Sequence, residues 1–319
     1  MTSLSALSIR GVDMGKTLTI TPQLSRVVRY EQLVPCKDAF IDTRTPGSDA
    51  KENFTIIGPG VSENPNQHIH IAEPHGFNIG GARQPPGCTN SQHSHETEEV
   101  FFIHSGEWVF RLGEHGEDAE IILRPGDLIS IPTHVFRGFE NVGSCEGFLW
   151  AVLGGDDPGR VLWAPSVFDM AEDYGLVLLE NGNLVDVAAG ENLPKDIAPM
   201  PRTSWAQIEA LQSLNDGDLA ARCLTGTAAQ QRSLIGPNGG ISNDHGFTVE
   251  RLYVSVGEEM RPETQTVPDV LFVHDGSLQV SVDDETIDLG PGDTFTVPKG
   301  AVRQWSSNKH ADFLRVMGT

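Results

Sequence analysis

Two histidines and a glutamate occur close together in the segment 92–99, at spacings that suit a metal site on a strand. Successive side chains of a β-strand point to opposite faces, so His93, His95 and Glu99 share a parity and can converge on one ion. Two imidazoles and one carboxylate form the facial triad of non-haem iron(II) oxygenases, which leaves coordination positions open for substrate and dioxygen. The segment therefore predicts one divalent transition metal per chain. Fe(II) suits it best, and manganese, nickel, zinc and copper are alternatives.

The elements that would position these ligands are short strands. Glycine (34 residues) and proline (20 residues) are plentiful, and they interrupt short runs of Val, Ile, Leu and Phe. Such runs bounded by turn residues are typical of strands in sandwiches and barrels. We therefore expect a mostly β protein. Because 319 residues exceed the usual size of one hydrophobic core, we expect two domains.

An internal repeat supports this division. The segment 99–106 (EVFFIHSG) is echoed by 269–276 (DVLFVHDG), an offset of 269 − 99 = 170 residues. The Pro-Gly-Asp turn at 125–127 is echoed at 291–293. Two copies of one strand-rich unit of roughly a hundred residues suit a pair of β-sandwich or jelly-roll domains in tandem.

The stretch between the two units has a different texture. The segments 167–174 and 204–214 are predicted to be helical, with Ser204 as the N-cap of the second. The predicted organisation is an N-terminal arm at 1–35, a first barrel with the metal site at 36–160, a partly helical connector at 161–217, and a second barrel at 218–319. The arm has no counterpart in the repeat, so it is expected to pack on a neighbouring domain or subunit.

Charge and cysteine usage limit the partners and the compartment. The formal net charge of −22 repels phosphate backbones and anionic membrane surfaces, so neither a nucleic acid nor a membrane is expected as a partner. The four cysteines lie far apart without CxxC spacing, which favours reduced thiols in the cytoplasm. Neither an export signal nor a membrane span is visible at the N-terminus. A small-molecule substrate is the expected partner.

The motifs resemble those of a known family. The spacing His93-x-His95-x3-Glu99-x6-Gly106 matches the first cupin motif, and Gly126-x5-Pro132 matches the start of the second. The chain thus resembles a bicupin, and among bicupins it is most similar to ring-cleaving dioxygenases of the gentisate and hydroxynaphthoate type. The resemblance implies two double-stranded β-helix barrels, with a metal held inside one of them. It also implies further association, so a homo-oligomer is expected.

Two residues depart from the second cupin motif. Cupins usually carry a glycine and a ligand histidine where this chain has His134 and Arg137. A guanidinium stays charged and cannot coordinate a cation, so three protein ligands are expected. Arg137 could clamp a substrate carboxylate or pair with Glu99 or another acid. His134 could move a proton or bind the metal, or it could simply face solvent in a turn.

The second unit has lost both histidines of the motif. Glu263, Gln265, Asp269 and Arg303 occupy the corresponding positions. The two acids are expected to pair with Arg303 inside the barrel, where a guanidinium would replace the charge of a metal. We therefore expect this barrel to be structural, or at most an accessory binding pocket.

Together these features predict a metal-dependent dioxygenase, with Fe(II) as the expected metal, that cleaves a small aromatic or related oxygenated substrate with dioxygen. In this hypothesis Arg137 orients a substrate carboxylate and His134 moves a proton. The alternatives are a metal-assisted isomerase, lyase or decarboxylase of a small organic acid, and a non-catalytic small-molecule-binding bicupin that kept the motif while losing turnover. For the three ligands themselves, the alternative to metal binding is a degenerate, empty cupin pocket. Activity without oxygen would favour the first alternative, and binding without product would favour the second.

Overall fold

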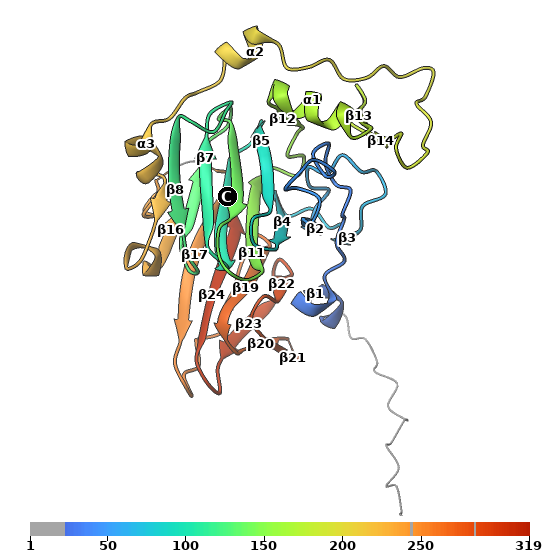
Figure 1. The fold of residues 1–319 in the computed structure, drawn as a ribbon. Coiled ribbons are helices and arrows are strands. Elements are labelled where there is room, and N and C mark those ends of the chain that lie inside the picture. Colours follow the sequence, from blue (N-terminus) through green and yellow to red (C-terminus); the bar gives the residue numbers. More distant parts are fainter. Residues whose placement is uncertain (1–22, 243–244, 284) are drawn as a thin grey trace, which may run out of the picture.

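The computed structural model describes residues 23–242, 245–283 and 285–319. Within these residues the chain forms two β-barrels, and each barrel is made of two facing sheets as in a jelly roll (Figure 1). The predicted class, mostly β with two tandem barrels and a partly helical connector, is confirmed.

The first barrel contains the sheet β15-β9-β6-β11-β4-β2-β3 and the sheet β12-β5-β10-β7-β8. The strands of the larger sheet are β2 (Glu52–Ile57), β3 (Ile69–Ile71), β4 (Phe77–Gln84), β6 (Glu99–Ser105), β9 (Leu128–Ile131), β11 (Gly147–Gly154) and β15 (Cys223–Leu224). Those of the smaller sheet are β5 (Thr89–His95), β7 (Trp108–Leu112), β8 (Ala119–Leu123), β10 (Arg137–Asn141) and β12 (Val161–Trp163).

The second barrel repeats this plan with the sheets β1-β22-β19-β24-β17-β16 and β18-β23-β20-β21. Its larger sheet contains β1 (Val27–Val28), β16 (Ser233–Ile235), β17 (Phe247–Val254), β19 (Asp269–Gly276), β22 (Thr294–Val297) and β24 (Ala311–Gly318). Its smaller sheet contains β18 (Glu263–Thr264), β20 (Leu278–Val282), β21 (Glu285–Leu289) and β23 (Val302–Ser306).

The sequence of strand β6 is apolar on both faces because both faces are buried. Phe101 and Ile103 pack in the interior of the first barrel, together with other buried side chains of that barrel. Val100 and Phe102, which point the opposite way, belong to a cluster shared by both barrels. Because the strand is covered on both sides, its residues form a continuous hydrophobic run instead of alternating with polar ones.

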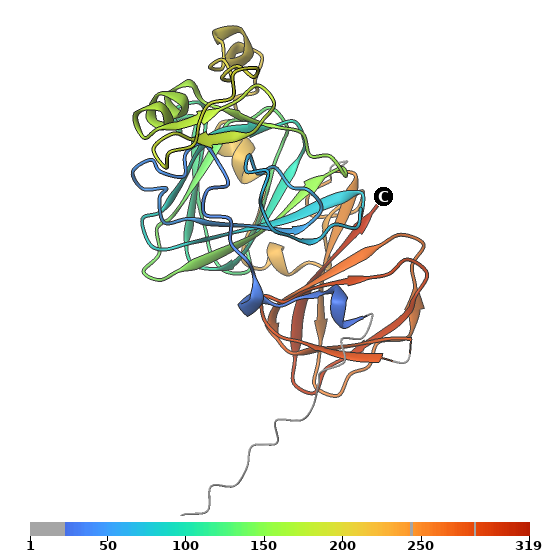
Figure 2. The same cartoon turned by 90° about the vertical axis from the view of Figure 1, so that its right-hand side faces the viewer.

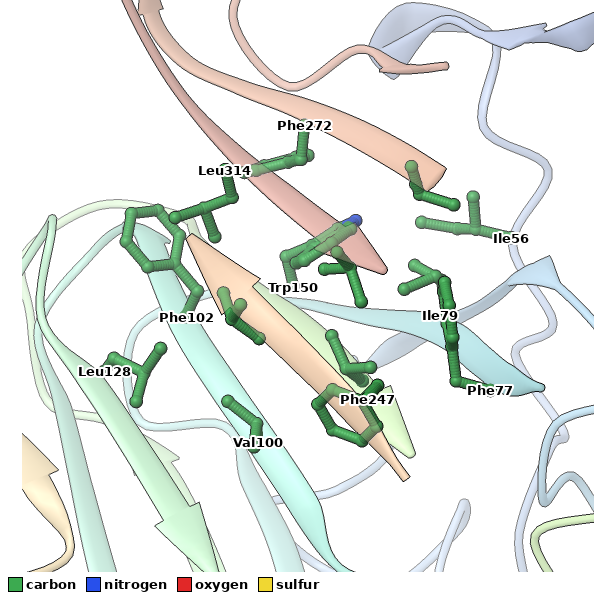
Figure 3. Packing of buried hydrophobic residues seen from close by; sticks show 14 of the residues in the cluster. Ile56, Phe77, Ile79, Val100, Phe102, Leu128, Trp150, Phe247, Phe272 and Leu314 are labelled. Atoms are coloured by element: carbon green, nitrogen blue, oxygen red, sulfur yellow. The ribbon is translucent and has the colours of Figure 1, made fainter. Parts of the chain in front are cut away.

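The two barrels are joined through this shared cluster (Figure 3). Trp150 of β11 stacks on Phe272 of β19 with 4.7 Å between ring centroids and 18° between ring planes. Next to them, the repeat-equivalent histidines His104 and His274 meet with their Nδ1 atoms 3.4 Å apart. The larger sheets of the two barrels thus pack face to face and share one hydrophobic core.

Each barrel also receives a strand from outside its own repeat. β1 pairs antiparallel with β22 of the second barrel, and β15 pairs antiparallel with the equivalent strand β9 of the first. The described part of the predicted arm, 23–35, therefore joins the second barrel through β1, where the blue segment runs in Figure 2. Its end reaches the first barrel, because the amide of Val34 donates to Nε2 of His70 at 3.1 Å. The rest of the arm, 1–22, lies outside the described residues. The predicted boundary at 217/218 assigns β15 to the second unit, although its pairing is with the first.

Most of the connector lies on the end of the first barrel that is remote from the second (Figures 1 and 2). This part contains the helices α1 (Pro165–Asp173) and α2 (Trp205–Glu209) and the hairpin of β13 (Leu176–Leu178) and β14 (Leu184–Asp186). The helix α3 (Asp216–Ala220) begins at the end of the connector and packs beside β8. Single 3-10 turns occur at Leu24–Arg26, Tyr30–Gln32 and Ala228–Gln230.

The second predicted helix is shorter than expected. Ser204 is its N-cap and forms a capping box with Gln207, as the sequence suggested. The helix ends at Glu209 and does not continue to Leu214. The residues that follow the helix contact the first barrel instead, because the amide of Gln212 donates to the carbonyl of His134 at 2.7 Å. A tertiary hydrogen bond thus overrides the local helical preference.

The four cysteines, Cys36, Cys88, Cys145 and Cys223, are all free thiols. The thiol pKa of Cys223 is raised to about 12 because the side chain is largely buried. None of the helices in the described ranges is long and apolar enough to cross a membrane.

Candidate metal centre

The three predicted ligands converge inside the first barrel. His93 and His95 lie on β5, two residues apart, and Glu99 begins β6 after a short turn. All three side chains are buried, and their ligand atoms lie within 4.8 Å of one another. The motif glycine that follows, Gly106, has a φ of +86°, and a Cβ there would lie 2.7 Å from the Cα of Gly147. The parity of the strand thus produces the cluster that the sequence predicts.

The ring of His93 is fixed in one tautomer. Its Nδ1 lies 2.7 Å from the carbonyl oxygen of Ser91, which can only accept, so Nδ1 carries the proton and Nε2 keeps its lone pair. The indole of Trp163 packs beside the ring with 5.3 Å between centroids. Burial, with a contribution from Arg137, lowers the pKa of His93 to about 3. The side chain is therefore a neutral imidazole at pH 7, the form that binds a metal.

His95 is a buried imidazole without ordinary partners. Its Nε2 lies 3.6 Å from Oε2 of Glu99. Its Nδ1 has no hydrogen-bond partner among the described residues. Burial and the nearby guanidinium of Arg137 hold the pKa of His95 well below its usual range, so the ring is also neutral. A buried nitrogen without a partner is costly, and a bound cation would give this ring the interaction that it lacks.

Arg137 lies directly behind Glu99. It begins β10, where its backbone pairs with that of His93 on β5. Its Nη2 and Nε donate to the same oxygen of Glu99, Oε2, at 2.6 and 3.2 Å, and its Nη1 donates to the carbonyl of Val135 at 3.3 Å. Burial raises the pKa of Glu99, and the guanidinium opposes this rise. Of the two roles expected for Arg137, the ion pair with Glu99 is the one that the structure contains.

The donor set is compatible with a divalent cation. Two neutral imidazoles and a carboxylate are ligands that Fe(II) and similar ions accept. Because both hydrogen bonds to Glu99 end on Oε2, the guanidinium does not occupy Oε1. His93, His95 and Glu99 are the residues that would hold the ion. Within the described ranges, no other group of three or more His, Cys, Asp or Glu side chains brings its ligand atoms together in this way.

His134 lies apart from the cluster. Its side chain is exposed, and it does not line the pocket above the metal ligands. Its φ of 60° is left-handed, which explains why related motifs use glycine at this position. Its amide donates to the carbonyl of His95 at 3.0 Å. The backbone of His134 thus supports the site, whereas its side chain is exposed.

A buried ion pair behind His93 escaped the sequence analysis. Lys51 and Asp42 are fully buried and pair with each other. The other carboxylate oxygen of Asp42 accepts from the amide of Ser91 at 3.0 Å, and the carbonyl of Ser91 is the one that fixes His93. Lys51 also donates to Oδ1 of Asn90 at 3.1 Å. The pair therefore holds in place the strand segment that orients a metal ligand.

A second buried acid supports the wall of the site. Glu63 accepts hydrogen bonds from the indole Nε1 of Trp163 at 2.6 Å and from the amide of Ile41 at 2.7 Å. Burial raises the pKa of Glu63 to about 8. Asp42 and Lys51 lie in the irregular region before β2, and Glu63 lies in the loop between β2 and β3. In neither segment does a sequence periodicity signal which side chains are buried.

The equivalent position of the second barrel contains an ion-pair cluster. Asp269 contacts Arg303 at 2.5 Å, as the sequence predicted, and also Arg315 at 3.0 Å, which it did not. Glu263 lies 3.4 Å from Arg303 and 3.1 Å from Arg315. The indole of Trp305 packs against both guanidinium groups. Two fixed cations thus contact Asp269, the residue that corresponds to Glu99 of the first barrel.

Comparisons with known proteins agree with this architecture. The cupin domain model matches residues 82–152 and 251–317, one match in each barrel. No curated protein matches the chain. Among solved structures, a gentisate adduct of salicylate 1,2-dioxygenase from Pseudoaminobacter salicylatoxidans is 16% identical, with 95% of this chain and 84% of that chain covered and a TM-score of 0.54.

A mutant of Bacillus subtilis oxalate decarboxylase is also similar, at 13% identity over 97% of this chain and 86% of that chain, with a TM-score of 0.54. A second structure of that decarboxylase, described for its Mn(II) centres, is 13% identical over 92% of this chain and 77% of that chain, with a TM-score of 0.52. At these identities the likeness shows the fold alone. The tandem barrels and the cupin match in each of them show that the chain is a bicupin of the cupin superfamily.

Proposed function

We propose that this bicupin is a metal-dependent dioxygenase that uses Fe(II), held by His93, His95 and Glu99, to cleave a small aromatic or related oxygenated substrate. The observation that carries the proposal is the convergence of three buried ligands at the end of a pocket lined mainly by apolar side chains. Three protein ligands leave coordination positions open, which oxygenase chemistry requires. A bound Fe(II) would supply the electron transfer between an organic substrate and dioxygen.

The residues of the chain would prepare this chemistry in distinct ways. Phe101, Phe139 and Trp163 line the pocket and keep bulk water away from the ligands. The carbonyl of Ser91 fixes the tautomer of His93, and Arg137 holds the carboxylate of Glu99 in one orientation. A substrate in the pocket would therefore meet ligands that need little rearrangement. We do not assign proton transfer to His134 in this proposal, because its side chain is exposed.

The proposal is tested by anaerobic reconstitution with Fe(II), followed by oxygen-uptake measurements with a panel of catechols, hydroxybenzoates and diketones. Uptake that depends on both iron and one substrate class is expected. A His95→Ala variant should lose both the metal and the uptake, and a His134→Ala variant should keep both. If no member of the panel causes oxygen consumption by iron-loaded protein, the dioxygenase assignment is contradicted.

A second candidate function is a metal-assisted decarboxylase or related lyase. The fold similarity to oxalate decarboxylase favours it, since the TM-score is as high as that for the dioxygenase. Such an enzyme would release carbon dioxide from a small organic acid in the absence of net oxygen consumption. Measuring carbon dioxide release and oxygen uptake in the same assay separates the two candidates, because the lyase releases carbon dioxide without net uptake.

A further inference from the structure

The pocket above the metal ligands has a chemical character that restricts its occupant. It encloses about 720 Å³, including space that is open to solvent. Much of its wall is aromatic or aliphatic, with Phe40, Phe54, Phe101, Phe139 and Trp163 as its largest members. Gly80 and Gly81 of β4 form part of the wall. A Cβ at Gly80 would have only the carbonyl oxygen of Phe54 near it, at 3.3 Å, so this position leaves room that a larger side chain would fill. The volume and lining suit a small organic molecule with an apolar body.

No lysine or arginine lines this pocket among the residues that the structure describes. Its ionisable lining residues are Cys36, His93, His95 and Glu99. Three of these are the proposed metal ligands, and the fourth, Cys36, is a thiol whose pKa is raised to about 11 by burial together with Asp38. The described lining therefore provides no fixed cation apart from a metal at the ligands.

The two nearest buried cations are already engaged. Every nitrogen of the Arg137 guanidinium donates to Glu99 or to the carbonyl of Val135, and the side chain is fully buried. Lys51 is fully buried as well, and it donates to Asp42 and Asn90. A carboxylate on the substrate would thus find no free guanidinium or ammonium to pair with.

We propose that the pocket selects an uncharged substrate with an apolar body, which reaches the metal through a hydroxyl or keto oxygen, and rejects analogues that carry a carboxylate away from the metal. The selection follows from desolvation. A carboxylate that leaves water without gaining a cationic partner has an unfavourable desolvation free energy that the contacts in the pocket do not offset. The strongly acidic surface of the chain adds a repulsive field of the same sign. This inference rests on the proposed function, because it specifies the substrate class for the same site.

A matched pair of probes tests the inference without relying on turnover. 4-Methylcatechol and 3,4-dihydroxybenzoate share one metal-chelating catechol and differ by a methyl group in place of a carboxylate. Their dissociation constants are measured by calorimetry on the full chain, both metal-free and loaded with redox-inert Zn(II). We expect the neutral probe to bind at least tenfold more tightly, which corresponds to about 1.4 kcal/mol. Equal binding, tighter binding of the acid, or failure of both probes to bind would overturn the inference.

A designed cation provides the converse test. Asn53 lines the pocket, and its Nδ2 has no hydrogen-bond partner among the described residues. Asn53→Lys should strengthen binding of 3,4-dihydroxybenzoate and reduce the tenfold preference, whereas Asn53→Met, which adds length without charge, should preserve the preference. An unchanged ratio in a folded Asn53→Lys protein would count against the charge argument, and the wild-type ratio decides the matter if that variant does not fold.

The outcomes also separate this inference from the dioxygenase proposal. If the neutral probe is preferred but no panel compound causes oxygen uptake by the iron-loaded protein, the pocket assignment stands and the reaction assignment fails. If oxygen uptake is found with a carboxylate substrate that binds as tightly as its neutral analogue, the reaction assignment stands and the pocket assignment fails. If the chain takes up no metal, the ratio on metal-free protein still tests the pocket.

Discussion

Arg137 donates two hydrogen bonds to a single oxygen of Glu99, from Nη2 at 2.6 Å and from Nε at 3.2 Å. The guanidinium occupies the position at which related cupin motifs place a fourth ligand, and it contacts one of the three ligands that remain. The site thus combines a metal-binding set with a fixed positive charge. In the second barrel both motif histidines are absent as well, and two guanidinium groups, those of Arg303 and Arg315, contact Asp269.

Replacing Arg137 separates its effect on the stability of the protein from its effect on metal affinity. Arg137→Met should destabilise the metal-free protein by about 3–5 kcal/mol, because it leaves the buried carboxylate of Glu99 unpaired. Added metal should recover part of this loss, since the cation takes over the pairing. Arg137→His should instead bind metal more tightly, by roughly tenfold or more, because it restores an imidazole. Urea unfolding with and without metal measures the first effect, and competition with a chelator measures the second. A metal affinity for Arg137→His at or below that of the wild type would argue against this geometry.

Removal of Lys51 should affect both stability and the site. Lys51→Met leaves Asp42 charged and buried, so a loss of about 3–5 kcal/mol is expected in urea unfolding. The double variant Asp42→Asn with Lys51→Met should lose less, because no uncompensated charge is left. Both variants should also weaken metal binding, since Asp42 holds the backbone of Ser91 that orients His93. A double variant that loses as much stability as Lys51→Met, or more, would show that the two side chains do not act as a pair.

Stability should fall in mild acid because of His104 at the contact between the barrels. Its pKa is lowered to about 4, chiefly by burial and next by His274, from a usual value of 6.5. The unfolded chain therefore binds the proton first, and the stability that the neutral ring contributes is present above pH 6.5 and is lost as the pH falls toward 4. The full loss is on the order of 3 kcal/mol. His104→Phe should show a shallower decline in melting temperature between pH 6.5 and 4, and identical slopes would contradict the assignment.

The stack of Trp150 on Phe272 should be a major contribution to the association of the barrels. Phe272→Ala removes a fully buried ring from the shared core and should cost about 3–5 kcal/mol. Phe272→Leu, which keeps most of the apolar volume, should cost clearly less. Thermal unfolding measured by calorimetry quantifies both losses. Similar losses for the two variants would mean that ring packing is not the main contribution.

The parts of this molecule that follow a simple period were predictable from its sequence. The alternation of a strand places His93, His95 and Glu99 together, and the repeat predicts two equivalent barrels. The role of Arg137 stayed open, because spacing does not tell whether a guanidinium faces a substrate or a neighbouring acid. Sequence could show the absence of histidines in the second barrel but not the contribution of Arg315, which comes from a different strand.

Other features depend on contacts that no local pattern encodes. The pairing of β1 with β22 and of β15 with β9 joins segments that are far apart in the chain, and two-residue strands have no recognisable period. The burial of Lys51 and Asp42 occurs in an irregular segment, where charged residues usually face solvent. The early end of the helix at Glu209 results from a tertiary hydrogen bond that outweighs helix propensity.

The metal content of the chain tests the central claim most directly. Untagged full-length protein is loaded with Fe(II) under anaerobic conditions, desalted and analysed for metals, with His95→Ala and Asp269→Ala treated in parallel. We predict about one iron per chain in the wild type and in Asp269→Ala, and almost none in His95→Ala. A wild-type chain that retains no metal, or a His95→Ala chain that retains as much, would contradict the account.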